Sequence, residues 1–401
     1  MRIAGIVAEY NPFHNGHAYL LEKTKELHGG CEATHLVAVM SGSFVQRGEP
    51  ATLSKFDRAK AALAGGVDLV IELPVPWCLS SAEGFASGAV SLLEAMGCVE
   101  AISFGTESGD LSPLKKAVTI METPRFSTLL KYYMDLGSAF PEAQQKAVAE
   151  IAGNTVSQVL DTPNNTLAIE YLKALNRLQS NIAPFTVKRY GAAHDNMIPL
   201  GNTASASYIR SLFESGRLIN ALPYMPAGCA TAVSSAAENG RLPATAQALD
   251  RAVLARLRSM SMEEIGKLPG ISEGLENRFY KAIRQASSLE ELETLIKTKR
   301  YPLTRVRRLI WSAFLGIPAG YANKRPPYLR VLASNEKGKE IVAAAKNAVL
   351  PWIYRASQIQ KLDEAAQAVW QLECRATDLH QLAFPTPLPC GADYTTGLIR
   401  E

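Results

Sequence analysis

The sequence predicts an α/β protein in which a doubly wound parallel sheet is followed by a mostly helical C-terminal region. Up to residue 215, short apolar runs alternate with helix-length segments, which is the pattern of strands and crossover helices in a parallel sheet. Beyond that point the strand pattern stops and helical segments follow one another. We therefore expect an α/β domain at 1–215 and a basic, mainly helical region at 216–401.

The expected elements follow from apolar periodicity and from Gly and Pro breakers. Strands are expected at 2–8, 34–40, 67–73, 98–104 and 185–190. Helices of the first half are expected at 18–23, 53–64, 80–96 and 166–177, with a long helical insertion at 111–153. Those of the second half are expected at 245–260, 262–268, 275–286, 289–297, 305–315 and 337–349.

Composition excludes several classes of protein. The chain has 401 residues, is 47% hydrophobic, and contains no apolar run of the ~20 residues that span a membrane. Its first apolar run is already a strand, so no signal peptide is visible. The six cysteines are scattered without a C-x-x-C pair, which argues against a zinc site or a disulfide framework. We expect a cytoplasmic protein with reduced thiols, no membrane partner and no protein-bound metal.

Charge is distributed unevenly between the two halves. Residues 1–215 carry 17 Lys and Arg against 21 Asp and Glu, a net charge of −4. Residues 216–401 carry 25 against 17, a net charge of +8. A basic half beside a mildly acidic one predicts that a polyanion docks on the second half.

The first strand leads into the most informative motif of the chain. Asn11-Pro12 is a turn signal, and His14-Asn15-Gly16-His17 follows it at the start of a helix. Histidines three residues apart share a face of a first helical turn, and glycine lets a ligand approach backbone N–H groups. A helix N-terminus with two imidazoles suits a phosphate whose charge grows during reaction.

Polar or glycine-rich segments also follow the other strands of the predicted sheet. Ligands of such sheets bind at the carboxyl ends of the strands, so we expect one shared pocket. The segments are 11–17, 41–49, 105–108 and 189–195, and the second belongs to an expected polar loop at 41–50.

After the fifth strand, Thr203–Arg210 reads TASASYIR. Ser205, Ser207 and Arg210 supply hydrogen-bond donors near this expected helix start. The alternative is a plain serine N-cap followed by a solvated arginine.

A dense basic run occupies residues 297–308, KTKRYPLTRVRR, with no acidic residue. Such a run favours contacts with a nucleic acid backbone, although it can also be a solvated face. Tyr301 within it is suited either to stack on an unpaired base or to pack in the helical core. The residues predicted to bind this nucleic acid are Lys297, Lys299, Arg300, Arg305, Arg307 and Arg308.

An ordered set of segments resembles the tRNA(Met) cytidine acetate ligase family of the HIGH-type nucleotidyltransferase superfamily. The chain reads HNGH where the superfamily has HxGH, and TASASYIR resembles its ISxTxxR-like element, with Ala204 and Ser207 where Ile and Thr are common. The matching segments are AEYNPFHNGH, SGSFVQRGEPA, DLVIELP, SFGTES, PNNTLAIEYLKAL, KRYGAAHD and KTKRYPLTR; residues 385–401 carry no recognised feature.

The resemblance implies that ATP and acetate form acetyl-adenylate and that the acetyl group passes to N4 of the wobble cytidine of elongator tRNA(Met). Catalytic roles fall on His14, His17 and Arg210. Gln46 and Arg47 are expected on the acetate and α-phosphate side, or else form an ordinary turn. The implied ATP-binding residues are Val7, Ala8, Glu9, Tyr10, Asn11, Pro12, Phe13, His14, Asn15, Gly16, His17, Ala18, Tyr19, Leu20, Gly105, Asn164, Arg189, Ser205 and Ser207.

Purely structural roles remain open for three of these residues: Gly105 as the end of a strand, Asn164 as the cap of a helix, and Arg189 in a salt bridge at the sheet edge. Mg²⁺ is expected to arrive on the ATP phosphates, because no Cys/His/Asp cluster has ligand spacing.

Two other functions are considered. A small-molecule adenylyltransferase of cofactor synthesis would lack a basic helical half, and a non-catalytic RNA-binding protein would not need intact histidines.

Overall fold

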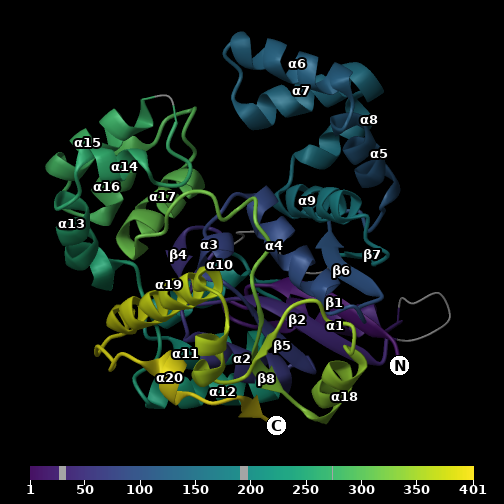
Figure 1. Ribbon diagram of the computed structural model, residues 1–401, viewed down its shortest axis with the longest axis vertical. Coiled ribbons are helices and arrows are strands. Elements are labelled where there is room, and N and C mark those ends of the chain that lie inside the picture. Colours follow the sequence, from purple (N-terminus) through teal and green to yellow (C-terminus); the bar gives the residue numbers. More distant parts are fainter. Residues whose placement is uncertain (27–32, 190–196, 273) are drawn as a thin grey trace.

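A mostly parallel sheet with helices on both faces forms the centre of the molecule (Figure 1). The computed structural model describes residues 1–26, 33–189, 197–272 and 274–401. The strands of this sheet are β1 (Ile3–Ala8), β2 (His35–Ser41), β5 (Leu69–Leu73), β6 (Ala101–Thr106), β7 (Ala183–Lys188), β8 (Leu329–Ser334), β9 (Trp352–Ile353) and β10 (Ile399–Arg400).

The strand order places the loop after β1 at the switch point of the sheet. The order is β10-β8-β5-β2-β1-β6-β7, and the five strands from β5 to β7 are mutually parallel. The chain winds outward from β1 in one direction through β2 and β5, and in the other through β6 and β7. Ligands of doubly wound sheets bind where the winding reverses, so the loop that holds the two histidines lies at the expected place.

Alternate residues of the central strands belong to two different cores. Ile3 and Val37 pack into a core with helices from one face, whereas Ala4 and Leu36 pack into the core on the other face. Strands buried on both faces read as continuous apolar runs. The helices packed nearest the sheet are α1 (Asn15–Glu26), α2 (Lys55–Ala64), α3 (Val75–Cys78), α4 (Ala82–Ala95), α9 (Pro163–Leu178), α10 (Ala206–Glu214), α11 (Leu218–Ala221), α12 (Ala227–Glu238), α18 (Glu336–Ala344) and α19 (Glu364–His380).

Two helical projections stand on the upper side of Figure 1. The first is the expected insertion, called here the arm: α5 (Ser112–Met121), α6 (Pro124–Asp135), α7 (Phe140–Ala152) and α8 (Asn154–Ser157). The second is called the helical region, and it packs around an apolar core that it shares with α3 and α19. Its helices are α13 (Asp250–Arg258), α14 (Met262–Gly266), α15 (Leu275–Gln285), α16 (Leu289–Ile296) and α17 (Leu303–Leu315).

The predicted fold class is confirmed, but the expectation that strands stop before residue 216 is wrong. β8 pairs with β5 in the antiparallel sense, and β10 pairs with β8 at the edge of the same sheet. β8 was missed because it is a single apolar run among helical segments, and β10 was missed because it has only two residues. The division at residue 215 stays a prediction, and the second half completes the sheet of the first.

A buried ionic cluster ties the C-terminal segment to the sheet. Lys55 of α2 lies 2.7 Å from Glu72 of β5 and 2.7 Å from Asp393 of α20 (Ala392–Thr395). Arg330 of β8 lies 2.8 Å from Glu72 and 2.6 Å from Asp393, while Glu373 of α19 lies 3.3 Å from Lys55. Charges removed from water require such partners, so residues 385–401 have a structural role that the sequence did not reveal.

Removing one carboxylate of this cluster should destabilise the fold strongly. In Asp393→Asn, Lys55 and Arg330 remain buried with one negative partner fewer, and the loss of one member of a buried ion pair costs about 3–5 kcal/mol. Urea denaturation measures this change. Glu336→Gln removes an exposed surface pair with Lys339 and serves as the control with an unchanged midpoint. An equally unchanged midpoint in Asp393→Asn would contradict the structural role.

Candidate functional site

The two histidines of the HNGH turn lie face to face. The ring centroids of His14 and His17 are 3.9 Å apart with planes inclined by 26°. His17 also contacts the rings of Tyr10 and Phe13 at 5.0 and 5.4 Å, and both of those side chains are buried. Tyr10 reaches this position with φ 45°, at the bend between β1 and the cis Asn11–Pro12 bond. The sharp bend therefore brings both imidazoles to the carboxyl end of β1.

Hydrogen bonds set the tautomer of both imidazoles, and burial keeps the rings neutral. The backbone N–H of His14 donates to Nδ1 of His17 at 3.2 Å, and that of Gly16 donates to Nδ1 of His14 at 3.1 Å. Nδ1 is an acceptor in each ring, so a neutral ring carries its proton on Nε2. Burial lowers the pKa of His14 to about 3, and the positive charges of Arg189 and Arg210 act in the same direction. The pKa of His17 is also held well below its usual range, chiefly by burial.

Gly16 has a role that differs from the expected one. A Cβ at this position would lie 2.9 Å from Cε1 of His14, which is closer than ordinary packing allows. The N–H of Gly16 is already bonded to that same ring. The glycine therefore makes room for the imidazole of His14, and an open approach to its own N–H group is not what the structure provides.

The remaining residues of the turn anchor it to other loops. Asn15 donates from its side chain to the carbonyls of Asn202 at 2.7 Å and Pro223 at 3.1 Å. The side-chain oxygen of Asn11 accepts the N–H of Thr52 at 2.7 Å. Of the other predicted nucleotide residues, Val7 and Ala8 end β1, Pro12 lies in the bend, and Ala18, Tyr19 and Leu20 lie in the first half of α1.

Arg58 is a supporting residue that sequence reasoning missed. Its guanidinium is fully buried and donates to the carbonyls of Glu9 at 2.6 Å, Ser41 at 3.0 Å and Leu53 at 3.3 Å, and also to that of Gly42. One side chain thus joins the ends of β1 and β2 to the start of α2. The sequence shows only an arginine among alanines in a helix, and this pattern does not distinguish a buried arginine from a solvated one.

The expected polar loop at 41–50 is instead a largely buried hairpin. β3 (Phe44–Val45) and β4 (Glu49–Pro50) pair in the antiparallel sense. Phe44 and Val45 have no exposed surface, and Gln46 and Arg47 form the partly exposed tip. The side chain of Glu9 accepts the N–H of Gln46 at 2.6 Å. The apolar pair was overlooked because two residues are too short for a strand pattern.

Arg210 connects this hairpin to the HNGH turn. Its guanidinium donates to the carbonyl of Asn11 at 2.9 Å and lies 3.2 Å from a carboxylate oxygen of Glu49. Ser205 is the N-cap of α10 and accepts the N–H of Tyr208 at 3.1 Å, which is the plain serine N-cap considered above as the alternative. Ser207 is partly exposed in the first turn of the same helix. Arg210 is therefore no plain solvated residue.

The next two strands bring further predicted residues to the same edge. Gly105 lies inside β6 and does not end the strand. A Cβ at this position would lie 3.4 Å from Cγ of Arg189. Asn164 and Thr162 both donate to the carboxylate of Glu107 at 2.9 Å, so Asn164 is no helix cap. Arg189 follows β7; the rest of its loop, residues 190–195, lies outside the described residues.

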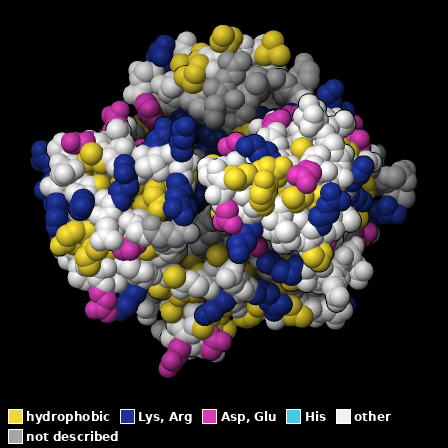
Figure 2. Space-filling view, turned by 90° about the horizontal axis from the view of Figure 1, so that it is seen from above, with side chains coloured by type: hydrophobic (Ala, Val, Ile, Leu, Met, Phe, Trp, Pro, Cys, Tyr) yellow, Lys and Arg dark blue, Asp and Glu magenta, His cyan; other side chains and the backbone are white. Residues whose placement is uncertain are grey.

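The basic run divides into two groups. Lys297, Lys299 and Arg300 are exposed before α17. Figure 2 shows Lys and Arg side chains along the edge of the helical region, on the left, that faces a hollow beside the arm. The other arginines are engaged in contacts with protein groups: Arg305 with Gly270 and Ser272, Arg307 with Glu293, and Arg308 with Gln46.

Tyr301, for which two roles were open, is buried in the core of the helical region at 7% exposure. Arg305 lies 5.2 Å from its ring centroid. Stacking on an RNA base is therefore wrong for this residue, and packing in the core is its role.

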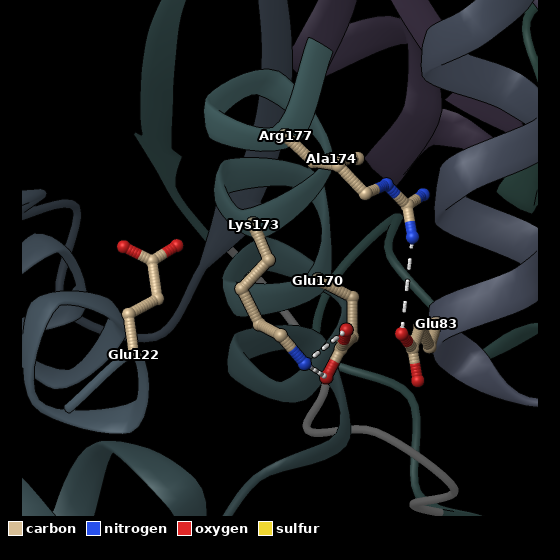
Figure 3. Close-up of a pocket in the computed structure, with 6 residues that line it drawn as sticks. All are labelled: Glu83, Glu122, Glu170, Lys173, Ala174 and Arg177. Carbon is tan, nitrogen blue, oxygen red and sulfur yellow. Dashed lines mark hydrogen bonds and ion pairs between the residues drawn. The ribbon is translucent and has the colours of Figure 1, made fainter. Parts of the chain in front are cut away.

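A second hollow lies away from the HNGH turn (Figure 3). It is lined by residues of α4 and α9 and by Glu122 at the end of α5. Lys173 pairs with Glu170 at 2.9 Å and Arg177 with Glu83 at 3.9 Å. None of the predicted site residues lines it. Among the residues that the structure describes, no group of three or more His, Cys, Asp or Glu could hold a metal, and no helix is long and apolar enough to cross a membrane.

His380 packs against the hairpin as a neutral imidazole, and its contribution to folding stability depends on pH. His380 has no exposed surface, donates from Nε2 to the carbonyl of Ala51 at 2.6 Å, and packs edge-on against Phe44. Burial lowers the pKa of His380 to about 4. Between this value and about 6.5 the unfolded chain binds a proton that the folded chain does not, so the stability from this group is lost as pH falls.

We predict that His380→Gln flattens the pH dependence of stability. The difference in slope should reach about 1.4 kcal/mol per pH unit between pH 6 and pH 4.5, because one histidine no longer titrates in the unfolded chain. Urea denaturation of both proteins across this range measures it. Parallel curves for the wild type and the variant would show that His380 is not held neutral.

Comparisons with known proteins agree with this geometry. The sequence model of the HIGH nucleotidyl transferase family matches residues 1–390. A tRNA(Met) cytidine acetate ligase of Thermoanaerobacter sp. (strain X514) is 40% identical, with both chains covered completely, and one of Acetivibrio thermocellus is 36% identical with the same coverage.

Two solved structures also match this chain over its whole length. The apo crystal structure of Thermotoga maritima TmcAL has a TM-score of 0.94 at 33% identity, and its complex with alpha-thio ATP has 0.92 at 32% identity. Both matches cover this chain and the other chain completely. The chain therefore belongs to the tRNA(Met) cytidine acetate ligase family of HIGH nucleotidyl transferases.

Proposed function

We propose that this chain is an ATP-dependent ligase that converts acetate to acetyl-adenylate and transfers the acetyl group to N4 of the wobble cytidine of elongator tRNA(Met). The observation that carries the proposal is the HNGH turn at the switch point of the sheet, with two stacked neutral imidazoles. The relatives named as tRNA(Met) cytidine acetate ligases support the substrates, because they match over the whole chain.

In the first step a carboxylate oxygen of acetate attacks the α-phosphorus of ATP and pyrophosphate leaves. His14 and His17 donate from Nε2 to phosphate oxygens, since Nδ1 of each ring is occupied by a backbone N–H group. Donors aimed at charge that develops in the transition state are the strongest catalytic contribution such groups make. Arg210 and Arg189 add positive charge at the same edge, and Mg²⁺ arrives on the ATP phosphates.

In the second step N4 of the cytidine attacks the acetyl carbonyl carbon, AMP leaves, and the amine loses a proton. The tRNA must therefore reach the same edge of the sheet. The exposed cations before α17 supply phosphate contacts to the tRNA. Figure 2 shows Lys and Arg side chains on the edge of the helical region that faces the arm. We place the reaction in the cytoplasm. A small-molecule adenylyltransferase is not favoured, because the full-length relatives carry a different name.

His14→Ala and His17→Ala should each lose adenylation while remaining folded. Loss of one transition-state donor costs on the order of 10²–10³ in rate, and a partly exposed turn tolerates truncation. Acetate-dependent pyrophosphate release from ATP measures the effect, with acetate and tRNA omitted in turn. His35→Ala is the control, since His35 lies at the opposite end of β2 and pairs with Glu340. Near-normal turnover in both site variants would refute the assignment.

Neutralising the exposed cations should separate the two steps. Lys297→Ala combined with Lys299→Ala should weaken tRNA binding, and each lost phosphate contact should reduce the slope of log affinity against log salt by about one unit. Adenylation should persist, because neither side chain belongs to the nucleotide turn.

Filter binding of tRNA at several salt concentrations, run beside pyrophosphate release, measures both effects. Lys339→Ala is the matched control, because this exposed lysine belongs to α18, which lies on the opposite side of the molecule from the helical region (Figure 1). An unchanged salt slope in the double variant would place the RNA surface elsewhere.

A further inference from the structure

The peptide of Gln46 is held from both sides by distant parts of the chain. Its N–H donates to the carboxylate of Glu9 at 2.6 Å, at the end of β1. Its carbonyl accepts a hydrogen bond from the guanidinium of Arg308 at 3.2 Å, from α17. Gln46 and Arg47 form the tip of the hairpin, so the position of this tip is fixed jointly by the nucleotide-binding edge and by the helical region.

The backbone of the hairpin tip lies directly against α17. Gly48 has φ +76°, and a Cβ there would lie 2.6 Å from the backbone nitrogen of Arg308 and 2.7 Å from Cβ of Arg307. A glycine satisfies both the backbone conformation and the close approach. The N–H of Gly48 also closes the turn onto the carbonyl of Val45 at 2.9 Å. The contact between the hairpin and α17 therefore admits no side chain at this position.

The other end of the hairpin is fastened to the HNGH turn. Glu49 lies 3.2 Å from the guanidinium of Arg210, and Arg210 donates to the carbonyl of Asn11 at 2.9 Å. A path of hydrogen bonds and ion pairs thus runs from Asn11, in the bend before the HNGH turn, through the backbone of the hairpin to α17.

We propose that Arg308 is a positioning residue for adenylation: by holding the carbonyl of Gln46 it fixes the hairpin tip beside the HNGH turn. The proposal rests on the proposed function for what the tip binds, namely acetate beside the α-phosphate. It also moves Arg308 out of the predicted tRNA surface, because its guanidinium faces the hairpin. Burial lowers the pKa of Arg308 to about 10, as expected for a side chain enclosed by protein.

The neighbouring arginines do not share this role. Arg307 lies 2.9 Å from Glu293 of α16, and Arg305 donates to the carbonyl of Gly270 at 2.9 Å. Both of these contacts lie within the helical region. Arg308 is therefore bonded across to the hairpin, whereas Arg305 and Arg307 are bonded within the helical region.

The test compares Arg308→Ala, Arg308→Lys and Arg258→Ala. Arg258 is the matched control, because its guanidinium donates to the carbonyl of Ala286 at 2.8 Å inside the helical region. In Arg308→Ala we expect kcat/KM for acetate to fall about 10- to 100-fold, a typical cost of a displaced substrate-binding group. The KM for ATP should change less than twofold. Arg308→Lys should recover part of the loss, and Arg258→Ala should match the wild type.

Two further measurements decide between positioning and other roles. Hydrogen exchange should accelerate in residues 44–50 of Arg308→Ala, with α13–α16 unchanged, and the salt slope of tRNA binding should equal that of the wild type. A slope reduced by about one unit with intact adenylation would make Arg308 a phosphate contact and overturn the proposal. Equal losses for acetate and ATP would also overturn it.

Failure of the proposed function would be recognised separately. It would appear as wild-type protein that releases no pyrophosphate in an acetate-dependent reaction. Hydrogen exchange in residues 44–50 still tests the contact with Arg308 in that case: unchanged exchange in Arg308→Ala overturns the positioning role, and local acceleration supports it.

Discussion

The candidate site depends on one buried guanidinium, that of Arg58. A fully buried cation is tolerated only where its N–H groups are bonded, and Arg58 meets this demand with the carbonyls of the loops after β1 and β2 and before α2. One guanidinium thereby holds together backbone carbonyls from these three parts of the chain. The same bonds fix the end of β1 from which the HNGH turn departs, and the orientation of His14 and His17 follows from that position.

The first half of the chain depends on interactions with residues of the second half. Asp393 and Arg330 supply charges to the buried cluster around Lys55, and His380 supports the carbonyl that follows the hairpin. Arg308 reaches the hairpin tip from α17. The proposed adenylation site is thus assembled from both halves, although the sequence suggests a catalytic half and an RNA-binding half. This arrangement gives a physical route by which the helical region can influence the first step.

The sequence was sufficient for the fold class, the five parallel strands and the HNGH turn, because these produce long apolar runs and strong turn signals. It was insufficient where structure depends on contacts distant in sequence. β8 joins the sheet out of order, the short strands of the hairpin look polar overall, and Arg308 resembles its neighbours in the basic run. The roles of Gly16 and Tyr301 also required coordinates, because a sequence does not say what a residue packs against.

The most direct test of the account is transfer of labelled acetate to RNA. Purified protein is incubated with labelled acetate, ATP and elongator tRNA(Met), and in parallel with a tRNA in which the wobble cytidine is replaced by uridine. The account predicts ATP-dependent label on the first RNA, at the wobble cytidine, and no label on the second. Equal labelling of both RNAs, or none on either, would contradict it.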